Sequence, residues 1–268
     1  MKIYDCIQFF NEEHILELRI NILNKYVNYF VIVESTSDHQ GNPKKLNFDI
    51  NKFKKYENKI IYLIVDDTPE EIKKPHLGGE SLVEQHQRNS IVRALKNASN
   101  DDLIILSDVD EIPDLTKLGK FNKKNKYAVF SQKAFTYKLN LINKAENNWH
   151  GSRMCLKKHI KSMQWLRKLK FKKYPFWRID KLKNLQIIED GGWHFAYLLE
   201  AQDISKKIKS FAHGEDNKKE NTDLGNIFKK MENLLHPTKP FKLQKIEIDE
   251  TFPKYIIENK EKLKKWII

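Results

Sequence analysis

Short apolar runs alternate with helical periodicities along the first half of the chain. Continuous apolar runs are typical of strands that a parallel sheet buries on both faces, and they predict strands at 3–9, 29–34, 60–65 and 103–106. Residues 12–27 and 81–98 carry apolar side chains on one helical face, which predicts two amphipathic helices. This order predicts an α/β fold with a mostly parallel sheet flanked by helices.

The second half of the chain has a less regular pattern. Residues 126–141 predict a pair of strands, and further short strands are predicted at 185–188 and 194–199. Helices are predicted at 203–212, 221–235 and 258–268. No linker or repeat divides the chain, so we expect a single domain, residues 1–268. Its expected parts are a parallel half at 1–115, a smaller mixed region at 116–220 and a helical extension at 221–268.

Composition limits the class of protein. The 268 residues are 40% hydrophobic and 32% charged, which supplies a core and excludes a disordered or collagen-like chain. Cys6 and Cys155 form no CxxC pair, which excludes a disulfide framework and structural zinc. No apolar run approaches the roughly 20 residues of a membrane-spanning helix, and the first residues lack the apolar core of a signal peptide. We therefore expect a cytoplasmic protein.

Most of the net charge of +13 lies in one segment. Residues 157–183 contain eleven Lys and Arg and one acid, with aromatic residues between them. Such a segment indicates a local anionic partner, which we expect to be an anionic membrane surface at the inner face. An acidic polysaccharide is an alternative partner, and a solvated helix that packs its Trp and Leu inward explains the pattern equally well. A nucleic-acid partner is not expected.

Asp108 and Asp110 follow the buried run 103–106 and form the sharpest chemical motif. In an extended chain, residues two apart point to the same side, so both carboxylates can hold one divalent cation, Mg²⁺ or Mn²⁺, together with a diphosphate. Acidic residues after a strand are often only turn residues, but the Glu-Ile-Pro that follows favours a ligand site. Ligands of parallel sheets bind beyond the carboxyl ends of the strands, so residues 10–12 and 34–36 are expected nearby.

Three further motifs combine histidine with glycine or aromatic residues, at 149–153, 189–195 and 210–215. A carboxylate in the second motif is a candidate general base, and its histidine is a candidate metal ligand or phosphate donor. A lone histidine is more often a hydrogen-bonded structural residue, and the third motif is equally typical of a helix end capped by Gly214. Arg88 and Asn89 lie on the second predicted helix and could face the same end of the sheet.

Taken together, the motifs resemble glycosyltransferase family 17. The resemblance is carried, in the family's order, by residues 5–12, 17–19, 29–36, 87–89, 107–113, 149–153, 191–195 and 210–213. It implies a GT-A fold of the Rossmann-like type, a nucleotide-sugar donor, a divalent metal and inversion at the anomeric carbon. The best-known member adds the bisecting β-1,4-N-acetylglucosamine to N-glycans. UDP-GlcNAc is therefore the expected donor, and a microbial or viral glycan or glycolipid the expected acceptor.

The residues and the resemblance together predict individual roles. Residues 1–115 are expected to bind the nucleotide sugar, and residues 116–220 the acceptor. Asp190, with Glu189 as the alternative, is the predicted general base that takes the proton from the acceptor hydroxyl. The predicted metal ligands are Asp108, Asp110, His194 and His213. The predicted nucleotide and donor contacts are Phe10, Asn11, Glu12, Glu34, Ser35, Arg88, Asn89, Asp108 and Arg153, and the predicted acceptor contacts are Trp149, His150 and Trp193.

Two other classes of function remain open at this point. A basic module that binds glycan or nucleic acid without catalysis explains the charge of 157–183 but not an acidic motif at a strand end. A metal-dependent phosphohydrolase would use Asp108, Asp110 and Glu111, and it leaves the tryptophan–histidine motifs unexplained.

Overall fold

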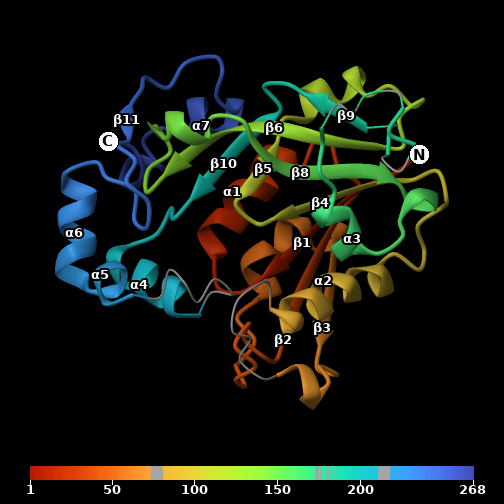
Figure 1. Cartoon of the computed structure of the whole chain (residues 1–268), viewed down its shortest axis with the longest axis horizontal. Helices are drawn as coiled ribbons and strands as arrows, with labels where there is room; N and C mark the ends of the chain where they lie inside the picture. The colour runs from red at the N-terminus through yellow and green to blue at the C-terminus, as the bar shows by residue number, and fades with distance from the viewer. Residues whose placement is uncertain (74–80, 173–174, 176, 180–181, 184, 211–217) are drawn as a thin grey trace.

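A mixed β-sheet with helices on both faces forms the centre of the computed structural model (Figure 1). The structure describes residues 1–268 except 74–80, 173–174, 176, 180–181, 184 and 211–217. The strands are β1 (Ile3–Phe9), β2 (Tyr29–Ser35), β3 (Ile60–Val65), β4 (Leu103–Asp108), β5 (Glu111–Pro113), β6 (Tyr127–Thr136), β7 (Leu141–Ile142), β8 (Trp149–Leu156), β9 (Leu185–Ile188), β10 (Gly192–Ala196) and β11 (Gln244–Lys245). The α-helices are α1 (Glu13–Leu23), α2 (Leu82–Ala94), α3 (Met163–Lys168), α4 (Ala201–Ser210), α5 (Lys219–Thr222), α6 (Leu224–Glu232) and α7 (Lys254–Glu258).

The predicted parallel half is confirmed. Strands β4, β1, β2 and β3 lie side by side in this order, and each neighbouring pair is parallel. Alternate residues of these strands enter two different cores: in β1, Ile7 and Phe9 face the core that α1 covers, whereas Tyr4 and Cys6 face the core that α2 and α3 cover. Burial on both faces explains why the strands are continuous apolar runs.

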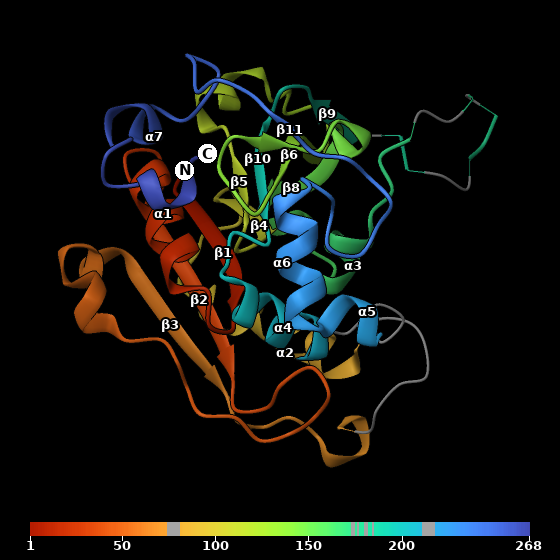
Figure 2. The same cartoon turned by 90° about the vertical axis from the view of Figure 1, so that its left-hand side faces the viewer.

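The second half of the chain extends the same sheet and adds a small layer beside it. β8 is antiparallel to both β4 and β6, and therefore places residues 149–153 next to the strand that ends at Asp108. β10 pairs antiparallel with β5 and parallel with β6. The predicted strand pair in 126–141 is confirmed in outline, since β6 pairs antiparallel with β7. These pairings bring three separate stretches of sequence, residues 108–113, 149–153 and 192–196, to one end of the sheet (Figures 1 and 2).

The predicted helix at 258–268 is wrong. The structure has α7 before this region and only a 3₁₀ turn, Lys264–Trp266, within it. The last residues bond to the turn after β6 instead: the amide of Leu139 donates to the carbonyl of Trp266 at 2.8 Å, and the amide of Ile268 donates to Oδ1 of Asn140 at 3.0 Å. Tertiary hydrogen bonds and the packing of Trp266 against the core override a weak helical preference here.

Candidate active site

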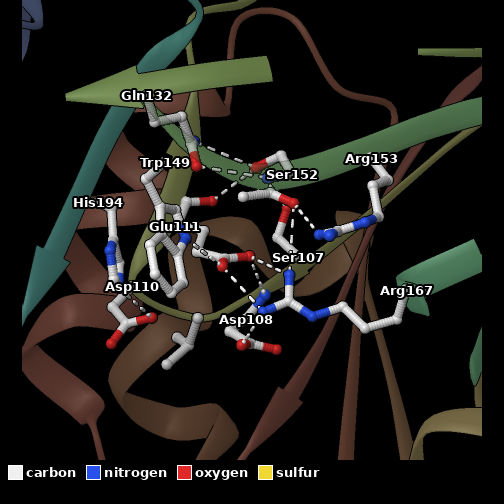
Figure 3. A network of polar contacts seen from close by, with 12 residues as sticks. Ser107, Asp108, Asp110, Glu111, Gln132, Trp149, Ser152, Arg153, Arg167 and His194 are labelled. Atoms are coloured by element: carbon white, nitrogen blue, oxygen red, sulfur yellow. Dashed lines mark hydrogen bonds and ion pairs between the residues drawn. The ribbon is translucent and has the colours of Figure 1, made fainter. Parts of the chain in front are cut away.

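The carboxyl ends of β1 and β4 lead into a group of charged side chains, which we call the charged cluster. It joins five carboxylates to four cations, so neither sign dominates. The carboxylates belong to Glu12, Glu84, Asp108, Asp110 and Glu111, and the cations to Arg88, Arg153, Arg167 and Lys207. Figure 3 shows its central part, with side chains from β4, β5, β8, β10 and α3 converging.

A buried ion pair fixes the backbone that carries the acidic motif. The guanidinium of Arg19, on α1, donates to both oxygens of Asp5 at 2.7 and 2.6 Å, and both side chains are fully buried. Its remaining nitrogen donates to the carbonyls of Asp108, Val109 and Glu111 at 3.2, 3.3 and 2.7 Å. One arginine therefore ties α1, β1 and the loop 108–111 together and sets where the acidic side chains point.

Glu111 is fully buried and anchors the cluster. Its carboxylate accepts from both terminal nitrogens of Arg167, at 2.7 and 2.9 Å, and from the indole Nε1 of Trp149 at 2.7 Å. The amide of Asp108 donates a fourth bond at 3.0 Å. Burial opposes the charge of Glu111, but Arg167 outweighs it and holds the pKa of this carboxyl at about 2. Glu111 is thus an ionised structural residue whose acceptor sites are all in use.

Asp108 and Asp110 have different cationic partners. Asp108, whose side chain is 40% exposed, accepts from Arg167 at 2.6 Å and lies 3.7 Å from Arg88. The side chain of Asp110, 14% exposed, lies 3.4 Å from Nζ of Lys207 and 3.8 Å from Nε2 of His194. In Figure 3, Asp108 lies on the Arg167 side and Asp110 on the His194 side. The contacts of Asp110 are long, so this carboxylate is the less tightly bound of the two.

Lys207 and His194 surround Asp110. Burial opposes the charge of Lys207, but Asp110 and Glu12 raise the pKa of this lysine above its usual range. The ring of His194 stacks on Trp149 with centroids 4.5 Å apart. Its Nδ1 is buried and has no hydrogen-bond partner among the described residues. A buried ring nitrogen without a partner is costly, which indicates a group that is completed by a ligand or by water.

Arg153, on β8, is a second side chain with unused hydrogen-bonding capacity. It donates to the carbonyl of Gly151 at 2.5 Å, while its buried Nε has no partner within the described part of the chain. Burial and the neighbouring Arg167 lower the pKa of Arg153 to about 10. An arginine that is desolvated and repelled by another arginine would be stabilised by an anion.

Arg88 and Asn89, predicted to contact the donor, hold α3 in place. Arg88 pairs with Glu84 on its own helix and donates to Oε1 of Gln164 at 2.5 Å. The side-chain oxygen of Asn89 accepts from the backbone amide of Gln164 at 2.9 Å. Because Gln164 belongs to the first turn of α3, these contacts determine where Arg167 lies.

The residues predicted at the ends of β1 and β2 lie beside a loop at 36–48. Glu34 is fully buried and accepts four hydrogen bonds, from Lys44, Tyr62 and the amides of residues 47 and 48. A carboxylate has about four acceptor positions, so a ribose hydroxyl would have to displace one of these donors. Ser35 is buried and accepts from the amide of Ser37 at 3.0 Å.

Phe10, Asn11 and Glu12, predicted to contact the nucleotide, follow β1. The carbonyl of Phe10 accepts from the side chain of Asn47 at 2.6 Å. Asn11 is exposed, and Glu12 lies 3.5 Å from Lys207. Of these three, the contacts connect Glu12 to the charged cluster.

The predicted general bases do not join the cluster. Glu189 and Asp190 are exposed and precede β10, where the carbonyl of Asp190 accepts from Lys117 at 2.5 Å. In the β5–β10 pair, Glu111 lies opposite His194, and Pro113 lies opposite Gly192. Asp190 precedes Gly192, so it lies past the Pro113 end of the pair, whereas Asp110 lies past the Glu111 end. Asp190 instead lines a separate cavity of about 660 Å³ between α1, residues 113–117 and residues 250–255.

The predicted acceptor residues are divided between these two places. Trp149 belongs to the cluster through Glu111 and His194. Trp193 is buried, donates to the carbonyl of Thr251 at 3.2 Å and lines the separate cavity. His150 is half-buried, and its ring lies 6.5 Å from that of Phe171. His213, a predicted metal ligand, lies outside the described residues.

Two glycines of the motifs lie where neighbouring strands approach closely. A Cβ at Gly151 would lie 1.8 Å from Oε1 of Gln132, so any larger residue would require the Gln132 side chain to move. Gly192 has φ +135° and its Cβ would lie 2.3 Å from the carbonyl oxygen of Ile112. Both therefore allow β8 and β10 to approach β6 and β5 closely.

The residues that sequence reasoning missed are Arg167, Lys207 and the Asp5–Arg19 pair. Arg167 lies in the basic segment, beside Met163, Leu166 and Leu169, which share one face of a helical pattern, but nothing local separates it from the lysines around it. Lys207 likewise resembles its neighbours on α4. Their roles follow from the tertiary contacts with Asp108 and Asp110.

Comparison with known sequences defines the class of protein. Residues 1–234 match the profile of Glycosyltransferase family 17, and the chain belongs to that family. This is the family that the motifs resemble. This result favours the transferase hypothesis over the binding module and the phosphohydrolase.

Individual relatives are more distant. The "Beta-1,4-mannosyl-glycoprotein 4-beta-N-acetylglucosaminyltransferase" of Rattus norvegicus and that of Homo sapiens are each 26% identical to this chain over 116 residues. The matched region is 42% of this chain and 22% of each relative, so the similarity spans about a fifth of the relatives' length.

Solved structures resemble the chain only in outline. HddC from Yersinia pseudotuberculosis has a TM-score of 0.37 at 10% identity, covering 70% of this chain and 90% of its own. The inositol-1-phosphate CTP transferase from T. maritima has a TM-score of 0.38 at 12% identity, covering 74% and 90%. At these scores the likeness supports no statement about function.

Replacing Arg19 by Met is expected to lower the free energy of unfolding by about 3–5 kcal/mol, because Asp5 is left buried without its counter-charge. Urea denaturation measures the change. Arg93→Met, which breaks an ion pair on the surface, is the matched control and is expected to cost less than about 1 kcal/mol. A loss for Arg19→Met no larger than the control's would contradict the role given to this pair.

Proposed function

We propose that this chain is an inverting, metal-dependent glycosyltransferase of the GT-A type. It transfers a sugar, GlcNAc from UDP-GlcNAc, onto a hydroxyl of a glycan or glycolipid and forms a β-linkage. Membership of family 17 and the similarity to relatives named as N-acetylglucosaminyltransferases support this assignment. The observation that carries it is the charged cluster at the carboxyl ends of β1 and β4, where sheets of this kind bind their ligands.

The donor set of the cluster is compatible with a divalent cation that arrives with a nucleotide. Within the described residues, no group of three or more His, Cys, Asp and Glu side chains is placed to hold a metal ion. Asp108 and Asp110 would therefore supply only part of the coordination, and diphosphate oxygens and water the rest, as hard cations in nucleotide sites allow. When bound, Mn²⁺ or Mg²⁺ neutralises the charge that develops on the leaving diphosphate.

The cationic side chains are proposed to hold the diphosphate itself. Arg153 offers its Nε, which has no partner in the described ranges, and Arg88 belongs to the same cluster. Charges fixed in advance by surrounding hydrogen bonds stabilise a developing negative charge without having to reorganise. His194 stays a candidate ligand of the cation or of a phosphate, because its Nδ1 lacks a partner among the described residues.

Inversion requires one in-line attack by an acceptor hydroxyl, whose proton passes to a carboxylate. Asp190, with Glu189 next, remains our proposal for this base. A base must lie within hydrogen-bond reach of the proton it takes. Asp190 therefore acts only if the acceptor hydroxyl is held at its end of β10, close to Trp193 and the separate cavity.

Donor binding provides the first test. We expect UDP-GlcNAc to bind more tightly with Mn²⁺ than without it, and Asp110→Asn to remove this metal-dependent gain, at least about tenfold in affinity, because one ligand of the cation is lost. Isothermal calorimetry measures both constants.

The control for this test is Asp101→Asn, an exposed aspartate that pairs with Lys158 away from the cluster. It is expected to bind as the wild type does. If no UDP-sugar binds to the wild type with or without Mn²⁺, the proposed function is wrong. If another UDP-sugar binds in place of UDP-GlcNAc, only the donor assignment is wrong.

The assignment of the base is tested without knowing the acceptor. UDP release from UDP-GlcNAc, with water as the acceptor, still requires removal of a proton. Asp190→Asn is expected to lower this rate by about 10²–10⁴ while donor affinity stays within twofold. Glu189→Gln is the paired variant, and a larger loss there would move the role to Glu189. If both variants release UDP at the rate of the wild type, the proton acceptor must be one of the carboxylates of the charged cluster.

Membrane contact through 157–183 is a separate part of the proposal. No helix in the described ranges is long and apolar enough to cross a bilayer. Met163 and Leu166 are fully buried in the core, so the helical stripe itself packs inward. The described parts of the chain between α3 and β9 instead extend away from the sheet, where Trp177 and Ile179 are 65% and 90% exposed (Figure 2). Exposed apolar side chains among lysines fit an anionic interface.

Co-sedimentation with vesicles tests this contact. The wild type is expected to sediment with vesicles of phosphatidylcholine and phosphatidylserine, and not with phosphatidylcholine alone. Replacing Lys168, Lys170 and Lys172 by Gln is expected to abolish most of the binding, whereas Gln at Lys260, Lys262 and Lys264 serves as the matched control. Equal sedimentation of the two triple variants would refute the contact.

A further inference from the structure

One guanidinium is shared between two carboxylates of very different burial. Arg167 gives both of its terminal nitrogens to Glu111, which is fully buried, and one of the two also to Oδ2 of Asp108 at 2.6 Å. Asp108 is 40% exposed at its side chain. The contact with the inner partner, Glu111, costs much free energy to break, because it would leave a buried charge unpaired. The outer partner, Asp108, can be replaced by water or a ligand (Figure 3).

The inner pair is held in place from several sides. Glu111 accepts from Trp149 and from the amide of Asp108, and Arg167 also donates to the carbonyl of Gly151 at 3.3 Å. Contacts of Arg88 and Asn89 with Gln164 fix the start of α3, on which Arg167 lies. If one contact of Arg167 yields, it is the contact with Asp108.

The outer contact occupies the motif oxygen that a cation would need. Oδ2 of Asp108 already binds Arg167, and Oδ1 lies 3.7 Å from Arg88. A divalent cation that approached Asp108 alone would meet two guanidinium groups at short range. A diphosphate changes this balance, because its negative charges can pair with the arginines and its oxygens can complete the coordination of the cation.

We propose that Arg167 is a positioning residue that makes divalent-cation binding at Asp108 depend on the nucleotide diphosphate. This inference rests on the proposed function and adds that the cation binds tightly only when the diphosphate is also bound. In the ligand-free chain Arg167 keeps Asp108 paired, so the cation binds weakly alone. With the diphosphate present Arg167 keeps Glu111, releases Asp108, and both charged ligands bind more tightly together. By linkage, each ligand strengthens the other by the same factor.

Binding of Mn²⁺ alone is the decisive measurement, because it requires neither nucleotide nor turnover. Free Mn²⁺ is followed by electron paramagnetic resonance in titrations of the whole chain. We expect weak binding to the wild type and binding about tenfold tighter to Arg167→Gln, since Asp108 then lacks the nearer of its two competing cations. Arg93→Gln, which removes an arginine of α2 that pairs with Asp67 on the surface, is the matched control and should leave the constant unchanged.

A second variant protects the test against loss of folding. Arg167→Gln leaves Glu111 buried without its counter-charge, whereas Arg167→Lys keeps the charge but lacks the fork that reaches both carboxylates. Arg167→Lys is expected to bind Mn²⁺ alone with an affinity between wild type and Arg167→Gln. If neither variant tightens Mn²⁺ binding, or if the wild type already binds Mn²⁺ alone as tightly as with UDP, the inference is overturned.

Titrations with UDP distinguish a failure of this inference from a failure of the proposed function. Calorimetry of UDP with and without Mn²⁺, corrected for the titration of UDP with Mn²⁺ in buffer, gives the coupling factor. We expect about tenfold or more in the wild type and less than about threefold in Arg167→Lys. If UDP binds to the wild type but the factor is the same in the variant, only the role of Arg167 fails. If UDP does not bind at all, the proposed function fails first.

Discussion

The structure of the site depends on one buried arginine. Arg19 neutralises Asp5 and uses its remaining nitrogen to hold three carbonyls of the loop that follows β4. Three of the four residues 108–111 are acidic, and Arg19 supplies hydrogen-bond donors to backbone carbonyls of this loop that burial would otherwise leave unsatisfied. Because α1 packs on the sheet through its apolar face, Arg19 transmits the position of that helix to Asp108 and Asp110. The position of the acidic side chains at this end of the sheet therefore depends on a buried ion pair beneath them.

Around this loop, the carboxylates are held by cations from two different helices. Glu111 and Asp108 pair with Arg167 of α3, while Asp110 lies near Lys207 of α4. Buried charges persist only when they are paired and hydrogen-bonded, and this requirement explains why four cations lie among the five carboxylates of the charged cluster. Such pairing fits the proposed ligand, which would bring negative charge and a cation together.

Several motif residues turn out to support the scaffold. Asn89 fixes the start of α3, Glu34 holds the loop at 36–48, and Gly151 and Gly192 allow strands to approach closely. Their chemistry could not be told from the sequence, because a carboxylate or amide near a strand end suits a ligand and a backbone amide equally well. For Asp190, closeness in sequence was misleading. It is only four residues from His194, yet it lies before the start of β10, while His194 lies further along the extended strand and nearer the cluster.

The sequence determined the parallel core, since strands buried on both faces must be continuous apolar runs and the helices between them must be amphipathic. It also determined the acidic motif after β4 and, through the order of its motifs, the family. Local pattern failed where distant hydrogen bonds decide, as in residues 258–268, and where identical side chains differ only in their surroundings, as with Lys207 among the lysines of α4. Which cation faces which carboxylate depends on desolvation and distance, and those quantities exist only once the chain has folded. The tertiary structure alone therefore decided that Arg167 holds Glu111 and Asp108 and that Asp190 lies outside the cluster.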